Sequence, residues 1–132
     1  MKITADTNIL VRAATQDDPS QGPAARKLIT EAELVAVTLT ALCEFCWVLR
    51  VGYKLPDAEI AAAIRLLLGA DNVALDTTAV EEGLKLLDAG GDFADAIIAY
   101  TGKWLGGETF ASFDRKAAKL LGAQSAKVLI PQ

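Results

Sequence analysis

The sequence predicts an α/β fold, a three-layer α/β/α sandwich around a central, mostly parallel sheet of about five strands. Short apolar or β-branched runs alternate about five times with longer amphipathic segments, which is typical of parallel strands covered by helices. The chain has 132 residues and a 52% hydrophobic content, enough to build the core of one domain. We therefore expect residues 1–132 to form a single domain.

The first half of the chain contains two strands, each followed directly by a helix. Residues 2–5 form a strand that ends at a polar turn, Asp6-Thr7-Asn8, where the first helix begins. The segment Asp17-Asp18-Pro19-Ser20 opens the next helix, with proline in its first turn. Residues 34–37 form the second strand, and Thr38 or Thr40 caps a helix that runs to about Gly52.

The second half repeats the alternation with three further strands. A helix begins at Pro56-Asp57-Ala58-Glu59 and leads to a strand at residues 72–75. Thr77 or Thr78 caps the following helix, which stops at Gly90-Gly91. The last elements predicted are a helix from Asp92 to about Leu105, a strand at 109–112, a helix from Asp114 to about Gly122, and a strand at 127–130.

The composition excludes several kinds of chemistry. The chain has no histidine, which rules out Ser-His-Asp and Cys-His catalysis and every histidine-ligated zinc site. The two cysteines, Cys43 and Cys46, are too few for a four-cysteine zinc site, and we expect them to pack in the core. The net charge of −4 argues against general electrostatic binding of nucleic acid, but not against a nuclease that binds metal ions at a local acidic site.

No membrane or export segment is expected. No stretch of the sequence approaches the ~20 apolar residues of a membrane-spanning helix. The apolar run before Asp6 is too short for the core of a signal peptide. We therefore expect a cytoplasmic protein.

Acidic residues stand where open α/β sheets bind ligands, beyond the carboxyl ends of the strands. Asp6 ends the first strand, and Glu44 lies about one turn into the helix after the second. Asp95 lies in the first turn of a helix, and Asp114 follows the strand that ends near Ser112. These acids come from separate segments, and we expect them to converge at one edge of the sheet.

Converging carboxylates repel one another unless a cation lies between them. Ligation by oxygen alone suits Mg²⁺, with Mn²⁺ as a substitute. A water molecule on such a metal loses its proton readily and can attack phosphorus in line with the leaving oxygen. This chemistry supplies a nucleophile without histidine.

The same residues resemble a known family. The segment Asp6-Thr7-Asn8-Ile9-Leu10, Glu44, the segment Asp92-Phe93-Ala94-Asp95-Ala96 and the segment Ser112-Phe113-Asp114 are similar to the motifs of PIN-domain nucleases, most of all VapC-type toxins of bacterial toxin–antitoxin pairs. The resemblance implies that Asp6, Glu44, Asp95 and Asp114 bind the metal and catalyse hydrolysis of RNA. It also implies a small cognate antitoxin that blocks the site, and commonly a homodimer.

Several residues carry a second interpretation. Asp6 and Asp114 could simply cap helices, and Asn8 could orient Asp6. Asp92 and Asp95 lie three residues apart, the spacing of a capping residue and its partner, so we expect Asp92 to cap and Asp95 to bind metal. The family often has threonine where Ser112 stands, and we expect its hydroxyl to orient a carboxylate or water.

Other side chains have weaker claims. Arg115 and Lys116 could contact an RNA backbone or form a solvated face. Glu44 lies among apolar residues, so we expect it to be buried with a partner. Trp47, Tyr100 and Trp104 could stack on bases but are expected in the core or a dimer interface.

Two other functions remain as alternatives. A phosphoacceptor signalling domain is also a small α/β protein with acids at a sheet edge, but it needs an acid pair after the first strand, where this chain has Asp6 alone. A non-catalytic module would act through protein–protein contacts only. The presence of all four acids argues against it.

Overall fold

The computed structural model describes residues 1–132. They form two compact units, Met1–Thr77 and Thr78–Gln132. Each unit is described by itself.

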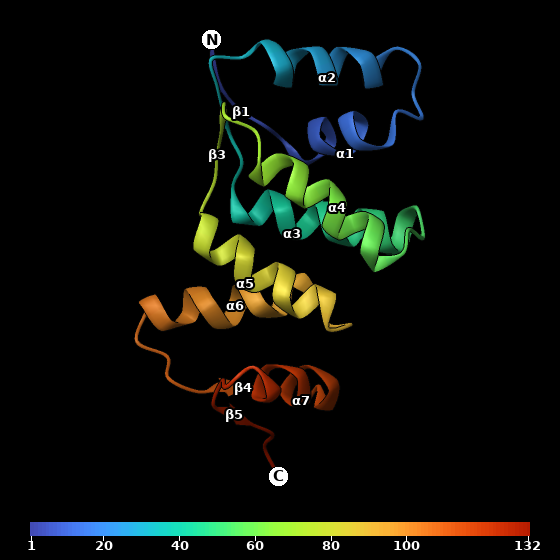
Figure 1. Ribbon diagram of the computed structural model, residues 1–132. Helices are drawn as coiled ribbons and strands as arrows, with labels where there is room; N and C mark the ends of the chain where they lie inside the picture. The colour runs from blue at the N-terminus through green and yellow to red at the C-terminus, as the bar shows by residue number, and fades with distance from the viewer. The chain divides into compact units, whose positions relative to one another are not determined.

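The first unit is built on three short parallel strands. β1 (Lys2–Thr4), β2 (Leu34–Ala36) and β3 (Val73–Ala74) lie in that order, with Ile3 opposite Val35 and Val35 opposite Val73. Figure 1 shows these strands side by side at one end of the unit's helices. Because all pairs are parallel, the strands end at the same edge of the sheet, and α1 and α3 begin there.

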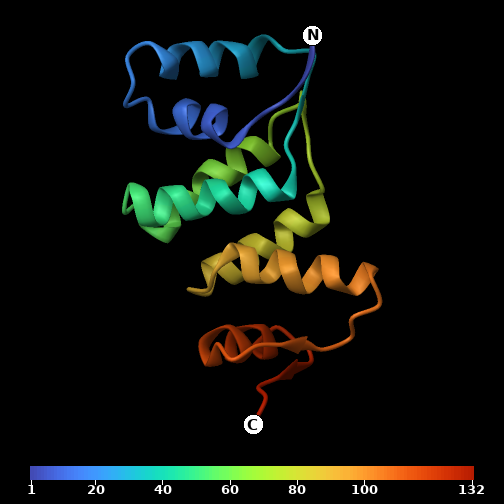
Figure 2. The ribbon, with the colours of Figure 1, turned by 180° about the vertical axis from the view of Figure 1, so that it is seen from behind.

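Five helical segments belong to the same unit as this sheet. They are α1 (Thr7–Thr15), α2 (Gln21–Glu31), α3 (Leu39–Trp47), the π-helix η1 (Val48–Gly52) and α4 (Asp57–Leu68). In both ribbon views α1 lies beside α2, and α3 lies beside α4 (Figures 1 and 2). The largest fully buried side chains of the unit are apolar and come from strand and helices alike: Leu10, Val35, Leu42, Phe45, Leu49, Ile60 and Ile64.

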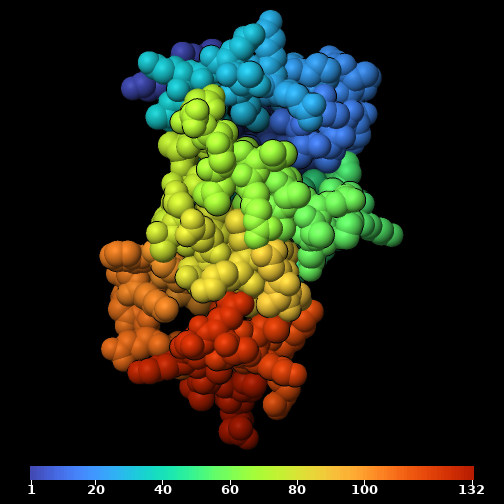
Figure 3. Space-filling model, in the orientation of Figure 1, coloured from blue at the N-terminus to red at the C-terminus, as the bar shows by residue number.

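The turn between α1 and α2 depends on Gln16. This residue ends α1 with a left-handed backbone (φ 54°), a conformation that L-residues rarely adopt. Its side-chain amide donates hydrogen bonds to the carbonyls of Arg12, Ala13 and Gly22. These bonds satisfy the free end of α1 and join it to the start of α2. In the space-filling view the side chains of α1 and α2 form one continuous surface (Figure 3).

The second unit has three helices and a pair of parallel strands. Its elements are α5 (Thr77–Asp88), which begins at the boundary, α6 (Phe93–Trp104), β4 (Phe110–Ala111), α7 (Arg115–Ala123) and β5 (Val128–Leu129). β4 and β5 pair in parallel. The buried side chains are again apolar: Val80, Leu84, Leu86, Leu87, Phe93, Ile97 and Leu121.

The predicted fold class is confirmed, since the chain is an α/β protein with five strands and only parallel pairs. The strands lie in two sheets, of three and two strands. Other differences are local. The helix α2 begins later than expected. Ser20 precedes it, and the proline in its first turn is Pro23 and not Pro19. Thr77 and Thr78 belong to α5.

The π-helix was not anticipated, and its wider turn changes the direction of the chain just after α3. No helix is long and apolar enough to cross a membrane.

Candidate functional site

Asp6 lies at the carboxyl end of β1 and caps α1. Its backbone is extended (φ −71°, ψ 157°), and its Oδ1 accepts a hydrogen bond from the backbone N–H of Thr7 at 2.8 Å. A carboxylate at this position also interacts favourably with the positive end of the helix dipole. The residue is exposed, so the cap leaves its other oxygen, Oδ2, open to solvent.

Glu44 is tied to the same helix start by Thr7. The Thr7 hydroxyl donates a hydrogen bond to Glu44 Oε2 at 3.0 Å, while the backbone N–H of the same threonine binds Asp6. Thr38 caps α3 by accepting from the N–H of Ala41, which starts that helix at the same sheet edge. One threonine therefore links the carboxylates of two helices.

Glu44 is not buried, contrary to the expectation from its apolar neighbours. Leu42, Phe45 and Cys46 are buried, but Glu44 itself is exposed. A helix alternates faces every few residues, so a glutamate within an apolar run can still point outward. The expected partner is present and is the hydroxyl of Thr7.

Asp6 and Glu44 together line an open pocket of about 380 Å³. The other walls come from α1 and from the segment that follows α3, and include Asn8, Arg12 and Tyr53. A second pocket of about 270 Å³ has the same two carboxylates, with Thr38 and Thr40 on its far wall. The two acids therefore face solvent-filled space on both sides.

Asp17 is the centre of a polar cluster next to this pocket. It accepts hydrogen bonds from the Thr15 hydroxyl (2.7 Å), the Tyr53 hydroxyl (2.8 Å) and Arg12 Nη1 (3.2 Å). The bonds from Thr15 and then Tyr53 are the main causes that lower the pKa of Asp17. The neighbouring Asp18 accepts from the backbone N–H groups of Gln21 and Ser20 at the start of α2, and these bonds lower its pKa.

The second unit places its candidate acids at two helix starts. Asp92 caps α6, with Oδ1 accepting from the N–H of Ala94 at 3.0 Å, and half-buried Asp95 lies in the first turn. Asp114 caps α7 by accepting from the N–H of Ala117 at 3.0 Å. Asp92 and Asp114 therefore both cap helices.

Ser112 and the basic residues stand around Asp114. The Ser112 hydroxyl accepts a hydrogen bond from the backbone N–H of Asp114 at 2.9 Å, which fixes the turn at the end of β4. Arg115 and Lys116 are exposed in the first turn of α7 and make no ion pair.

The donor set fits a hard divalent cation better than zinc. No three acidic or cysteine side chains gather closely enough within the structure to hold a metal ion. Mg²⁺, however, is commonly bound through one or two carboxylates, with water and substrate completing its shell. Asp6 and Glu44 provide such a pair on one pocket. Cys46 is buried and Cys43 half-buried, without a disulfide.

The tryptophans do not belong to the core. Trp47 is 65% exposed and Trp104 is 78% exposed, so the core placement expected for them is wrong, while the alternative placement in a dimer interface stays a prediction. Each lies at the last residue of its helix, where a side chain can point away from the helices that pack beside it. Tyr100 is half-buried.

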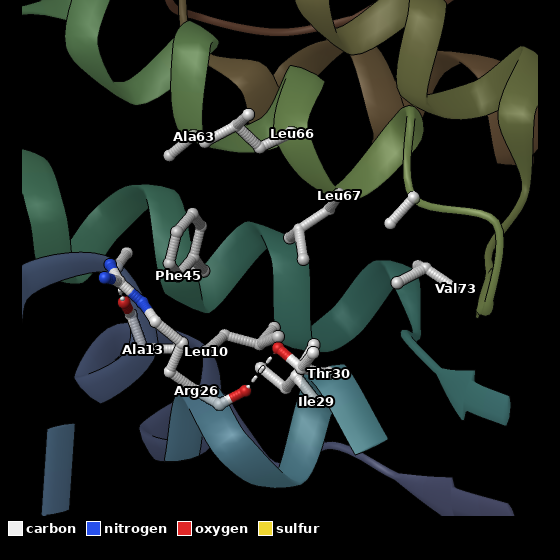
Figure 4. Close-up of a pocket in the computed structure, with 12 residues that line it drawn as sticks. Leu10, Ala13, Arg26, Ile29, Thr30, Phe45, Ala63, Leu66, Leu67 and Val73 are labelled. Carbon is white, nitrogen blue, oxygen red and sulfur yellow. Dashed lines mark hydrogen bonds between the residues drawn. The ribbon is translucent and has the colours of Figure 1, made fainter. Parts of the chain in front are cut away.

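A separate apolar pocket of about 250 Å³ lies among α1, α2, α3 and α4. Phe45, Leu10, Leu67 and Ala63 point into it (Figure 4), and Arg26 is its one charged lining residue. The Arg26 guanidinium donates a hydrogen bond to the backbone carbonyl of Ala13. This pocket has no carboxylate and shares no lining residue with the acidic pocket.

These features define an α/β protein that carries acidic side chains at the carboxyl ends of parallel strands. The family model of the PIN domain matches residues 3–121, which is most of the chain. The chain therefore belongs to the PIN-domain family of nucleases, as its motifs predicted.

One solved structure with similarity to the chain is the Mycobacterium tuberculosis toxin VapC20, described as cleaving the sarcin–ricin loop. It is 17% identical, the similarity covers 98% of this chain and 100% of that chain, and the TM-score is 0.46. No curated protein matches the sequence.

The sequence did not predict the roles of three residues at the pocket. Thr7 was expected to share the helix cap or to belong to the site, but the bond from its hydroxyl to Glu44 was not predicted. Its position directly after the acid at the strand end was the available signal. Arg12 and Tyr53 had no signal in the sequence, because Arg12 lies within α1 and Tyr53 directly follows the π-helix, and only packing brings the two residues to one pocket.

Proposed function

We propose that the protein is an Mg²⁺-dependent endoribonuclease and the toxin of a toxin–antitoxin pair. The observation that carries this proposal is the linked pair Asp6 and Glu44 on one open pocket, in a chain of the PIN-domain family. RNA as substrate, and pairing with an antitoxin, come from the resemblance of the motifs to VapC-type toxins.

Four carboxylates supply the metal ligands in this proposal: Asp6 and Glu44 from the first unit, Asp95 and Asp114 from the second. When bound, a divalent cation supplies a Lewis acid that activates water and offsets charge on the leaving oxygen. Manganese, which also prefers oxygen ligands, is expected to substitute.

The remaining residues orient these ligands. Thr7 orients both carboxylates, since its hydroxyl donates a hydrogen bond to Glu44 and its backbone N–H donates one to Asp6. Asp92 caps α6, which sets Asp95 in the first turn, and Ser112 sets the backbone of Asp114. Asn8 lines the pocket beside Asp6. Arg115 and Lys116 are exposed cations that can bind an RNA backbone.

The decisive experiment is digestion of structured RNA by the purified chain with Mg²⁺, with Mn²⁺ and with EDTA. Asp6→Asn and Asp95→Asn should each lower the rate at least about 100-fold, because loss of a ligand costs more than loss of a residue that only orients one. Asp71→Asn is the matched control, since Asp71 is exposed and lines no pocket with the acids. Cleavage that survives EDTA, or that persists in both variants, would sink the four-carboxylate mechanism. A parallel digestion of single-stranded DNA tests the choice of RNA.

The toxin role has its own test. Expression of the chain alone should arrest bacterial growth, and co-expression of the small protein encoded next to it should relieve the arrest. The Asp6→Asn variant is the control and should not arrest growth. Normal growth of cells that contain active wild-type nuclease would count against the toxin role, but not against nuclease chemistry.

A homodimer is also proposed, and a measurement of the molar mass in solution checks it.

A further inference from the structure

We propose that Arg12 binds a phosphate of the RNA beside the catalytic carboxylates, with its guanidinium oriented by Asp17. The inference rests on the proposed nuclease function and deepens it, because it names the residue of the first unit that receives the substrate.

One basic side chain lies beside the two carboxylates of the pocket. Asp6 and Glu44 are its acids, and Arg12 is the single basic residue among those that line it. Without a bound metal ion, an RNA strand in front of two carboxylates meets repulsion, and the net charge of −4 offers no general attraction to compensate. Arg12 is the fixed positive group of this pocket and therefore its contact for a phosphate.

The geometry leaves the guanidinium partly available. Arg12 Nε donates to Gln21 Oε1 at 3.0 Å and Nη1 donates to Asp17 Oδ1 at 3.2 Å. These bonds fix the plane of the group, while Nη2 donates to no protein acceptor. The side chain is 35% exposed, so a phosphate in the pocket can reach it. A planar guanidinium held in this way suits phosphate recognition better than a mobile ammonium group does.

Asp17 acts as a positioning residue. It accepts bonds from Thr15 and Tyr53 as well as from Arg12, and these bonds lower the pKa of its carboxyl. Arg12 lines the pocket and Asp17 does not. Asp17 therefore binds the guanidinium without itself lining the pocket.

Tyr53 extends this arrangement across the pocket. It follows the π-helix η1 and lines the same pocket as Arg12. Its hydroxyl bond to Asp17 connects the end of η1 to the turn after α1. The bond therefore joins Tyr53, which lines the pocket, to the carboxylate that binds Arg12.

The test is binding of a fluorescent single-stranded RNA in EDTA, where cleavage is blocked, over a range of salt concentrations. Arg12→Gln should weaken binding about tenfold, as expected for loss of one charge-assisted contact. It should also reduce the slope of log affinity against log salt by about 0.7, the value for one phosphate of a single strand. Arg12→Lys should restore the salt slope but only part of the affinity. In cleavage assays with Mg²⁺, Arg12→Gln should raise KM more than it lowers kcat.

Lys27→Gln is the matched control, because it removes one positive charge from an exposed position on α2 outside the pocket. Thermal melting checks that each variant folds. Wild-type affinity and slope in Arg12→Gln, equal losses in Arg12→Gln and Lys27→Gln, or no RNA affinity in the wild type would each overturn the proposal. A wild type that binds RNA with the expected dependence on Arg12, yet cuts nothing in Mg²⁺, would refute the nuclease function and leave the phosphate contact standing.

Discussion

Thr7 joins two carboxylates through two different groups. Its N–H binds Asp6 and its hydroxyl binds Glu44, so the position of Glu44 depends on a helix start more than thirty residues away in the chain. Outer hydrogen bonds of this kind orient metal ligands, and their loss typically lowers metal affinity or activity about 10–100-fold.

The prediction for Thr7 is that Thr7→Val lowers the rate of RNA cleavage about 10–100-fold, since valine keeps the shape but loses the hydroxyl. Thr7→Ser keeps the donor and should retain most of the activity. The measurement is the cleavage rate at saturating Mg²⁺, with thermal melting of each variant alongside. Equal rates for the valine and serine variants would show that the hydroxyl has no part in catalysis.

Asp17 gives the stability of the protein a defined dependence on pH. Its pKa is lowered by the bonds from Thr15, Tyr53 and Arg12. A lowered folded-state pKa contributes stability that is fully present above the unfolded pKa of about 3.9. This contribution is lost as the pH falls through the folded pKa.

We therefore expect Asp17→Asn to unfold more easily than the wild type at pH 7, and the difference to shrink in strong acid. Denaturant titrations across this range measure the free energy of unfolding of both proteins. A difference between Asp17→Asn and wild type that stays constant down to the lowest pH would contradict the assignment.

At the scale of elements, helix starts organise both units. Asp6, Thr38, Asp92 and Asp114 each cap a helix with a side-chain oxygen. The caps at Asp6 and Thr38 follow parallel strands in adjacent positions of one sheet. Adjacent parallel strands end at one edge of the sheet. The residues that cap the helices after these strands therefore lie at that edge, which is also where the candidate site lies.

Helix packing in the second unit depends on a glycine. A Cβ at Gly83 in α5 would overlap the ring of Phe93 at the start of α6, whereas a Cβ at Gly102 in α6 would meet nothing within 4 Å. Gly83→Ala should therefore destabilise the protein by about 1–3 kcal/mol through overpacking. Gly102→Ala should stabilise it by about 0.5–1 kcal/mol, the usual effect of alanine inside a helix.

Chemical denaturation of the two variants and the wild type measures both effects. The pair is well matched, because each change adds one methyl group to a helix of the same unit. Stabilisation by Gly83→Ala similar to that by Gly102→Ala would mean that α5 and α6 do not approach closely at this position.

For the whole molecule, the four proposed ligands divide evenly between the two units: Asp6 and Glu44 in the first, Asp95 and Asp114 in the second. A metal that binds only the folded chain stabilises it by about 2.7 kcal/mol when its concentration is 100 times the dissociation constant. The proposal thus predicts a rise in Tm with Mg²⁺ that requires acids of both units.

Glu44→Gln and Asp95→Asn should each reduce this rise, and Asp71→Asn should leave it unchanged. Differential scanning fluorimetry with increasing Mg²⁺ measures the shifts. A rise in Tm that depends on Glu44 but not on Asp95 would restrict the metal to the first unit and overturn the four-ligand assignment.

The sequence by itself determined the order, type and approximate ends of the elements, because these depend on local pattern and capping chemistry. The strand ends before Asp6 and Asp114, and the cap at Asp92, could be predicted in this way. Its motifs also indicated the family, which the match over residues 3–121 confirms.

Only the tertiary structure decided which side chains meet. The bond between Thr7 and Glu44, the exposure of Glu44, the cluster around Asp17 and the place of Arg12 in the pocket depend on how separate elements pack. The π-helix and the division of the strands into two sheets are decided at the same level. Local sequence patterns predict which secondary structure each segment forms. Contacts between distant segments depend on tertiary packing, which a short stretch of sequence does not determine.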